Sequence, residues 1–153
     1  MPPGERTLAV NRKARHDYFI HDTYEAGLVL TGAEIKSVRA GQANMRDSHV
    51  AIRDGEAWVV GMHIAPYRHA SDHDTYEPKR DRKLLLHRWE IARLLGRVQE
   101  KGFTIVPLRL YLRRNRAKLE IALARGKRLY DKRESIRKRD SDRDIERSLR
   151  RRR

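Results

Sequence analysis

The stretch SHVAIRDGEAWVVGMHI, residues 48–64, carries the clearest local signal in this chain of 153 residues. Apolar residues alternate with other residues on both sides of Asp54-Gly55: Val50 and Ile52 come before it, and Trp58, Val60, Met62 and Ile64 come after it. An Asp-Gly pair between two alternating runs is typical of a β-hairpin with a two-residue turn. The stretch therefore predicts two antiparallel strands, each with one apolar and one polar face.

A second hairpin is predicted further along the chain. Apolar positions alternate from Phe103 to Leu112, and Pro107 within this run marks an edge or a bulge, because proline cannot donate a backbone hydrogen bond. A polar turn over residues 113–116 leads to a partner strand that contains Leu119, Ile121 and Leu123. Basic residues recur at the positions that would face outward: Arg109, Arg113 and Lys118.

Other segments carry weaker signals. Residues 7–10 and 25–30 favour strands, residues 17–20 a helical turn, and residues 33–40 a short helix. After Arg88, apolar residues follow the i, i+3, i+4, i+7 spacing of an amphipathic helix that stops at Gly102: Ile91, Leu94, Leu95 and Val98. Short antiparallel strands with few helices predict a mainly β protein, a small closed or partly open barrel. Residues 65–82 show no periodicity, so this long loop is expected to be functional or mobile.

The last 29 residues, from Arg125 to Arg153, differ in composition from the rest. They hold 14 Lys or Arg and 6 Asp or Glu, and so carry +8 of the net charge of +15, while residues 1–124 carry +7. Their few apolar side chains cannot offset the entropy lost when such a segment folds alone. We therefore expect a folded RNA-binding domain, residues 1–125, and a basic tail, residues 126–153, that is disordered when free. A pI near 10.7 indicates nucleic acid as the first class of partner and an anionic membrane as the second.

The composition also bounds location and chemistry. The chain has no cysteine, which excludes disulfides and thiolate zinc sites and fits a reducing cytoplasm. The N-terminal residues lack the apolar core of a secretory signal, and the longest uncharged run is far shorter than the ~20 residues of a membrane span. His69 and His73 lie among acidic residues, but this spacing binds zinc when a helix holds it, and here the pattern indicates a loop. We predict no metal, no cofactor and no catalytic site.

Residues 11–18 are the best candidate for a nucleic-acid contact. They mix cations that can contact phosphates with rings on which bases can stack: Arg12, Lys13, Arg15, His16 and Tyr18. Looped RNA is recognised by such mixtures, and ordinary surface charge is the alternative.

Glu25 is an acid in a basic protein. It is either a surface ion-pair partner or an acceptor for a base edge or a ribose hydroxyl.

Several blocks of the chain match one known family in their order. They are NRKARHDYFI at 11–20, EAGLVL at 25–30, GAEIKSVR at 32–39, RKLLLH at 82–87, VPL at 106–108, and ALARGK at 122–127 followed by DKR at 131–133. Each block is weak alone, but together with the basic tail they are specific. The chain resembles the SmpB family, the bacterial protein partner of transfer-messenger RNA (tmRNA).

The resemblance implies a six-stranded antiparallel barrel of oligonucleotide-binding type with three helices, and no catalysis. It implies a monomer that binds the transfer-RNA-like domain of tmRNA and delivers it to ribosomes stalled without a stop codon, with alanyl-tmRNA and elongation factor Tu as indirect partners. The tail would enter the empty messenger channel past the decoding centre, contact small-subunit ribosomal RNA and fold there into a helix. Stalled products would then be tagged and the ribosome released.

Position by position, the resemblance assigns tmRNA contacts to Asn11, Glu25, Leu85 and Lys118. It assigns contacts on the ribosome to the tail: Gly126 at its base, then Lys127, Tyr130, Asp131, Lys132, Arg133, Ile136 and Lys138. Two positions depart from the commonest family pattern. This chain has Met45 where the family usually has an aliphatic residue, and His49 where the family usually has a tyrosine.

Two other classes of function fit the composition. A structural protein of the ribosome is also basic, with a small barrel and an arm, but it would copurify with ribosomes stoichiometrically. A rescue factor would be substoichiometric and would follow tmRNA. A metal-dependent nuclease that used residues 69–77 would cleave labelled RNA when a divalent metal is added.

Overall fold

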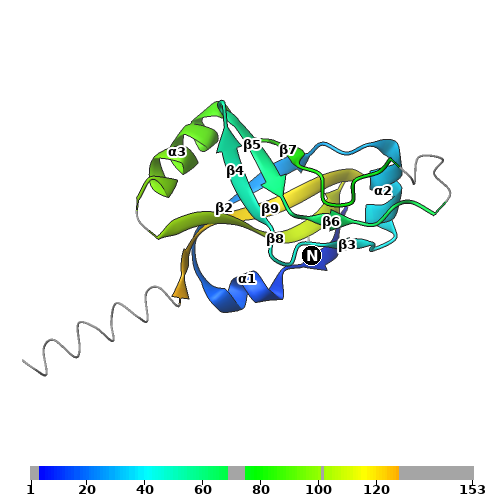
Figure 1. The fold of residues 1–153 in the computed structure, drawn as a ribbon, viewed down its shortest axis with the longest axis horizontal. Helices are drawn as coiled ribbons and strands as arrows, with labels where there is room; N and C mark the ends of the chain where they lie inside the picture. Colours follow the sequence, from blue (N-terminus) through cyan, green and yellow to red (C-terminus); the bar gives the residue numbers. More distant parts are fainter. Residues whose placement is uncertain (1–3, 69–74, 101, 128–153) are drawn as a thin grey trace, which may run out of the picture.

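The computed structural model describes residues 4–68, 75–100 and 102–127 (Figure 1). Seven strands form one antiparallel sheet in the order β1-β8-β9-β2-β7-β5-β4, and β3 pairs with β6 beside it. The strands are β1 (Glu5–Val10), β2 (Tyr18–Leu28), β3 (Ala43–Asn44), β4 (His49–Arg53), β5 (Glu56–Val60), β6 (His63–Ile64), β7 (Arg82–Leu85), β8 (Phe103–Arg113) and β9 (Arg116–Gly126). The helices are α1 (Arg12–Asp17), α2 (Gly32–Arg39) and α3 (Arg88–Val98).

The first predicted hairpin is confirmed as β4 and β5. Asp54 and Gly55 both have positive φ, 52° and 74°, which is what a two-residue turn between right-twisted strands requires. This turn pairs Arg53 with Glu56 and so fixes the register of the whole hairpin.

The predicted apolar face of β5 is wrong by one residue. Val50 pairs with Val59, and cross-strand partners share a face, so Val59 joins Val50 in the core. Trp58 and Val60 lie on the opposite face and are half-exposed. A shift of one residue moves every side chain of a strand to its other face, and the pairing across the turn decides between the two. At Gly61 φ is 84°, β5 ends and the alternation restarts, so that the next apolar residue, Met62, is fully buried as predicted.

The second predicted hairpin is confirmed as β8 and β9. The turn residues Arg114 and Asn115 have positive φ, 50° and 63°. The register shifts between Pro107 and Arg109, so the bulge expected at the proline is present. At the bulge, two consecutive residues, Leu108 and Arg109, both face outward. Even-numbered residues of β8 therefore face outward before the bulge, and odd-numbered residues face outward after it.

The sheet curls but does not close. The six-stranded barrel implied by the resemblance is therefore wrong, and of the closed and partly open alternatives the structure has the open one. β4, at one end of the strand order, lies against β8 (Figure 1). It forms no hydrogen-bonded ladder with β8, whose partners are β9 along its whole length and β1 over residues 109–113. The result is an open sheet of seven strands wrapped around one core, with three helices.

The helical turn expected at residues 17–20 is also wrong, because the helix comes earlier. Asn11 caps α1, its side-chain oxygen accepting the backbone N–H of Ala14 at 3.2 Å. From Tyr18 the aromatic and β-branched residues extend as β2, which suits their β propensity. The helices expected near residues 33–40 and from Arg88 are confirmed as α2 and α3.

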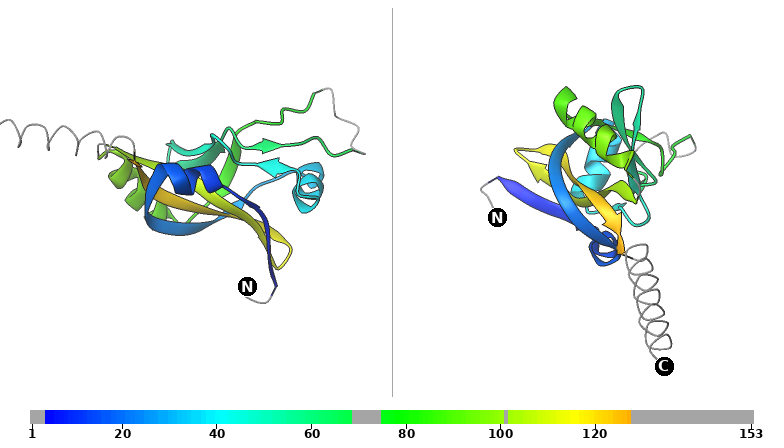
Figure 2. Two further views of the ribbon diagram at one scale, coloured as in Figure 1. Left: turned by 90° about the horizontal axis from the view of Figure 1, so that it is seen from below. Right: turned by 90° about the vertical axis from the view of Figure 1, so that its left-hand side faces the viewer.

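The curled sheet buries side chains on both of its faces. Its inner face encloses the main core, which holds Met45, Ile64, Leu94 and Leu119 among others. α1 covers one half of the outer face, and under it lies a smaller apolar cluster: Ala14, Val106, Leu108, Ala122 and Ala124 (Figure 2). The other half of the outer face has no helix over it.

A buried ion pair joins α2 to β7. Glu34 completes a capping box with Thr31 at the start of α2, and its carboxylate also accepts hydrogen bonds from Arg80 and Arg82. Arg82 is fully buried, and its Nε lies 2.6 Å from Glu34. Tyr76 donates to the same carboxylate at 3.2 Å and accepts from Arg82 at 3.0 Å, so the network also holds the described end of the loop. Burial opposes the charged carboxylate, but hydrogen bonds from Arg80, the Thr31 backbone and Arg82 outweigh it and lower the pKa of Glu34 to about 2.

Glu34→Gln is expected to destabilise the fold strongly, because it leaves the charge of Arg82 buried without its partner. Breaking a buried pair in this way costs about 3–5 kcal/mol, which corresponds to a fall in melting temperature of roughly 10 °C or more. Thermal and urea unfolding measure the effect. The control is Glu56→Gln, whose pair with Lys83 is exposed and contributes about 1 kcal/mol or less. Equal effects of the two substitutions would contradict the importance of the buried pair.

The same ion pair predicts a dependence of stability on pH. The pKa of Glu34 is lowered on folding from 4.5 to about 2, so its contribution is complete above pH 4.5 and is lost as the pH falls toward 2. The shift corresponds to about 3 kcal/mol. Urea unfolding at a series of pH values between 5 and 2 should therefore show a steeper loss of stability in the wild type than in Glu34→Gln. Parallel curves would contradict the prediction.

Candidate nucleic-acid interface

The uncovered half of the outer face brings together residues that are far apart in the chain. Five positions form one row across neighbouring strands: Thr7, Tyr111, Lys118, Gly27 and Leu85. We define the open half as this row together with the outward residues beside it: Glu5, Glu25, Arg109, Arg113, Arg116 and Glu120. It presents basic, acidic and apolar side chains on a rigid sheet, while the ring of Tyr111 is buried among them at 3% exposure. Basic side chains on such a surface can contact the phosphates of RNA.

Glu25 lies in the middle of the open half. The hydroxyl of Tyr111 donates a hydrogen bond to its carboxylate at 2.5 Å, and Arg113 donates two more at 3.1 and 3.3 Å. The hydrogen bond from Tyr111 is the main reason that the pKa of Glu25 lies below its ordinary value. Burial and the hydrogen bond to Glu25 raise the pKa of Tyr111 in turn. The carboxylate is therefore ionised at neutral pH and held in one place as an acceptor.

Arg109 connects β8 to both neighbouring strands. Its guanidinium donates to Glu5 at 2.5 Å and to Thr7 at 3.0 Å on β1, and lies 3.6 Å from Glu120 on β9. It also stacks over the ring of Tyr111, 4.1 Å from the ring centroid. These contacts fix the ring whose hydroxyl orients Glu25.

Leu85 is exposed although its neighbours in sequence are not. Leu84 is buried in the core and Leu86 packs against it, while Leu85 is 56% exposed. Its side chain lies over Gly27, where an added Cβ would be 3.2 Å from the Cβ of Leu85. Glycine at this position therefore leaves room for Leu85 to lie close to the sheet beside Lys118.

Asn11 is buried and does not present its side chain to solvent. Its Nδ2 donates to the carbonyl of Pro107 at 2.8 Å and to that of Met45 at 3.4 Å, and its backbone N–H donates to Leu108 at 2.8 Å. Together with the cap bond to Ala14, these contacts hold the start of α1 on the bulge of β8. The assignment of Asn11 to the RNA-binding set stays a prediction, and the geometry gives it a positioning role there.

The basic residues of α1 are exposed. Lys13 pairs with Asp47 at 2.5 Å and Arg15 with Glu120 at 3.3 Å, which ties the helix to the edge of the open half. Arg12 and Lys118 have no carboxylate within ion-pair distance among residues 4–68, 75–100 and 102–127, so their charges are available to a partner. His16 is exposed and lies 3.0 Å from Asp17.

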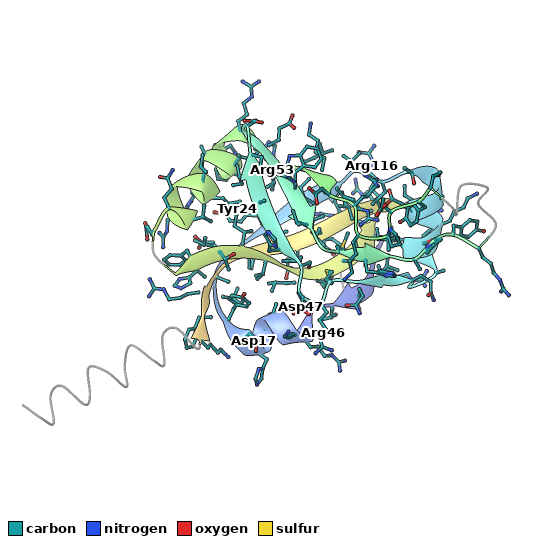
Figure 3. The ribbon with its side chains drawn as sticks, viewed as in Figure 1. Asp17, Tyr24, Arg46, Asp47, Arg53 and Arg116 are labelled. Carbon is teal, nitrogen blue, oxygen red and sulfur yellow. The ribbon has the colours of Figure 1, made fainter. Side chains whose placement is uncertain are left out.

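A cleft of about 390 Å³ lies between α1 and the start of β4, and it is lined by Lys13, Asp17, Asp47 and His49 among others. Figure 3 labels two of its lining residues, Asp17 and Asp47, beside α1. His49, one of the two departures from the family pattern, therefore lines a polar cleft, while Met45, the other, is buried in the core. Both types of residue suit their positions.

Gly126 and Lys127 lie far from the open half. β9 continues through Gly126, one residue beyond the expected domain boundary, and a Cβ there would meet the ring of Tyr18 at 4.0 Å. Lys127 lies over the ring of Phe19, 5.4 Å from its centroid. Eight residues of strand separate Lys118 from Gly126, which is about 26 Å. The other predicted tail residues, Tyr130, Asp131, Lys132, Arg133, Ile136 and Lys138, lie outside the described residues.

The metal site considered for the loop after β6 falls largely on residues 69–74, which lie outside the described residues. Within the part of the chain that the structure describes, no three His, Cys, Asp or Glu side chains are grouped so that they could hold a metal ion. Likewise, no helix in that part is long and apolar enough to cross a membrane.

Comparison with known proteins identifies the family. A family model described as "SmpB protein" matches residues 8–151. The chain belongs to the SmpB family. It is 62% identical over 148 residues to the "SsrA-binding protein" of Roseiflexus sp. (strain RS-1), covering 97% of this chain and 94% of that protein. It is 57% identical over 145 residues to the protein of the same description from Chloroflexus aggregans (strain MD-66 / DSM 9485), covering 95% and 92%.

A solved structure described as "tmRNA-SmpB: a journey to the center of the bacterial ribosome" matches with a TM-score of 0.65 at 49% identity, covering 78% of this chain and 83% of that one. The resemblance drawn from the sequence blocks is therefore confirmed. SmpB proteins are RNA-binding proteins without enzymatic activity.

Several residues of the interface were not predicted from the sequence. Tyr111 was seen only as part of an alternating run, and its contact with Glu25 joins positions 86 residues apart. The signal that could have identified it is the bulge at Pro107, because a change of phase there turns Tyr111 to the outer face. Nothing in the sequence indicates that Asn11 reaches two backbone carbonyls on different strands.

Two substitutions of Asn11 remove different sets of its hydrogen bonds and so test how much these bonds stabilise α1. Asn11→Ala removes the cap and leaves the carbonyls of Pro107 and Met45 unsatisfied, which together cost roughly 2–4 kcal/mol. Asn11→Asp keeps the acceptor for Ala14 but loses both donors and places a charge beside the carbonyls. We expect both variants to unfold at lower urea concentration than wild type and to exchange the amide protons of α1 faster. An Asn11→Ala variant with wild-type stability would show that these contacts do not hold α1.

Proposed function

We propose that this chain binds the tRNA-like domain of tmRNA and delivers it to ribosomes stalled without a stop codon. The observation that carries the proposal is the position of Glu25, Leu85 and Lys118 on adjacent strands of the open half. The resemblance assigned these residues to tmRNA, and they lie far apart in the sequence. The relatives described as SsrA-binding proteins support the same partner.

Two kinds of contact contribute to binding: basic side chains of the open half and α1 contact phosphates, and other side chains contact riboses and bases. Arg12, Lys118 and the other basic side chains contact phosphates, which gives most of the affinity and little sequence information. Glu25 is held as an ionised acceptor by Tyr111, so it can take a hydrogen bond from a ribose hydroxyl or a base amino group. Leu85 supplies an apolar contact beside it. His16 and Tyr18 on the α1 side offer rings to bases.

The tail acts in a different place from the open half. We propose that residues 126–153 enter the empty messenger channel, contact small-subunit ribosomal RNA at the decoding centre and form a helix there. The ~26 Å between Lys118 and Gly126 supports this division, because the tail leaves the domain at the end of β9 remote from the open half. The protein acts as a monomer in the cytoplasm, and elongation factor Tu meets it through alanyl-tmRNA.

The first test is Leu85→Asp, which places a negative charge on the open half. We expect binding to the tRNA-like domain to weaken by about tenfold or more, because the added negative charge would face the RNA. A tenfold loss of affinity corresponds to about 1.4 kcal/mol. The melting temperature should stay close to wild type, because Leu85 is exposed. Leu95→Asp is the matched control, an exposed leucine on α3 that should bind normally. Equal weakening by both variants, or none by Leu85→Asp, would contradict the proposed surface.

The second test separates the two parts of the chain. Replacing Asp131, Lys132 and Arg133 by alanine should abolish tagging of stalled products and leave tmRNA affinity unchanged. A chain that ends at Lys127 should retain most of that affinity, and the logarithm of its binding constant should fall by roughly 0.7–0.9 per phosphate contact per unit of log salt. Loss of tmRNA binding in the shortened chain would show that the tail, and not the domain, carries the RNA.

A further inference from the structure

The segment that joins the open half to α3 exposes large apolar side chains. Leu85 is 56% exposed, Val29 44%, and Trp89 62%, which is the most exposed large apolar side chain among the described residues. Val29 follows the end of β2, two residues beyond Gly27, and its backbone N–H donates to the carbonyl of Lys83 on β7 at 3.0 Å. An exposed tryptophan beside other apolar residues is typical of a binding site, because tryptophan contributes heavily to interfaces.

The packing of α3 directs Trp89 away from the protein. Leu94 is fully buried in the main core, and Ile91 and Val98 are half-buried on the same side of the helix. Trp89 precedes Ile91 by two residues, which is about 200° around an α-helix. Its ring therefore lies on the solvent side, so its exposure is set by the fold.

A second ring lies beside Trp89. The rings of His87 and Trp89 are nearly parallel, with an interplanar angle of 9° and centroids 6.4 Å apart. The side chain of Glu90 accepts a hydrogen bond from the backbone N–H of His87 at 3.0 Å. This bond fixes the first turn of α3, which carries both rings. A flat ring that stacks on Trp89 is thus also parallel to His87.

The charges nearby indicate what such a ring would belong to. Arg88 precedes Trp89, and Arg93 follows it by four residues and so lies on the same side of α3. Leu85, which belongs to the row with Lys118, precedes His87 by two residues and Trp89 by four in the chain. Aromatic rings flanked by arginines suit a nucleobase between two phosphates better than an apolar protein segment.

We propose that Trp89, with His87 beside it, stacks on an unpaired nucleobase of the RNA that the open half binds. This inference rests on the proposed function and adds a binding site to it. A base that is paired within a duplex cannot offer its face, so the site selects single-stranded or looped nucleotides. It extends the RNA contact from the sheet to α3 and makes α3 part of the interface.

Tryptophan fluorescence gives a direct test, because Trp58 and Trp89 are the only tryptophans in the full chain. In Trp58→Phe, the emission comes from Trp89, and in Trp89→Phe it comes from Trp58. Titration with the tRNA-like domain of tmRNA should quench the emission of Trp58→Phe. Trp58 lies opposite Lys83 on the same face as Leu85, so the emission of Trp89→Phe reports RNA bound on the sheet and not the proposed site. A fully base-paired RNA of equal length should not quench Trp89.

Affinity measured separately by gel shift gives the second readout. Trp89→Ala should weaken binding roughly 5- to 150-fold, the range for one base–aromatic stack, while Leu95→Ala should have no effect. Unchanged Trp89 emission at saturating RNA, equal quenching by the paired RNA, or wild-type affinity of Trp89→Ala would each overturn the site. In those cases RNA binding itself persists, whereas a failure of the proposed function would appear as the absence of any gel shift for the wild type.

Discussion

The interface depends on the way Asn11 holds α1 against the outer face of the sheet. Its side chain bonds at once to α1, to the carbonyl of Met45 before β4 and to that of Pro107 at the bulge of β8. These bonds keep α1 over the small apolar cluster that contains Ala14, and so decide which half of the outer face is covered. The remaining half is left to bind, and the basic residues of α1 stand along its edge.

The buried pair of Glu34 and Arg82 has a similar effect on the other side of the open half. Arg82 begins β7, and its burial against α2 fixes the phase of the strand. With Arg82 and Leu84 inward, Leu85 must face outward, beside Gly27. The ion pair is buried on the inner side of β7, yet it determines that Leu85 is exposed at the outer side, where the segment toward Trp89 begins. Stability and binding are linked through the register of β7.

The sequence predicted the parts of this structure that depend on local chemistry. The Asp54-Gly55 turn, the bulge at Pro107, the apolar stripe of α3 and the mainly β class all follow from short patterns, and the structure confirms them. The sequence analysis assigned the wrong residues of β5 to its apolar face. The correct assignment could have been predicted, because pairing across a two-residue turn places Val59 opposite Val50. The six-stranded barrel was not found because closure depends on pairing between distant strands, and the sequence does not show that β4 contacts β8 without a ladder between them.

The candidate site divides in the same way. Basic and aromatic residues of 11–18 could be recognised by composition, and Glu25, Leu85 and Lys118 only by resemblance to a family. Their meeting on adjacent strands, the support of Glu25 by Tyr111, and the buried position of Asn11 come from contacts between distant segments. Trp89 could have been noted as the residue opposite the apolar stripe of α3, but its alignment with His87 needs the fold.

Site-specific crosslinking tests the central claim, that the open half of the outer face contacts the RNA, most directly. A photo-reactive amino acid at position 118 would be compared with the same group at position 40, an exposed site at the end of α2, whose Val38 packs into the core on the inner face of the sheet. After irradiation with the tRNA-like domain of tmRNA, the account predicts crosslinks to the RNA from position 118 and few from position 40. Crosslinks of equal yield from both positions, or crosslinks from position 40 alone, would contradict it.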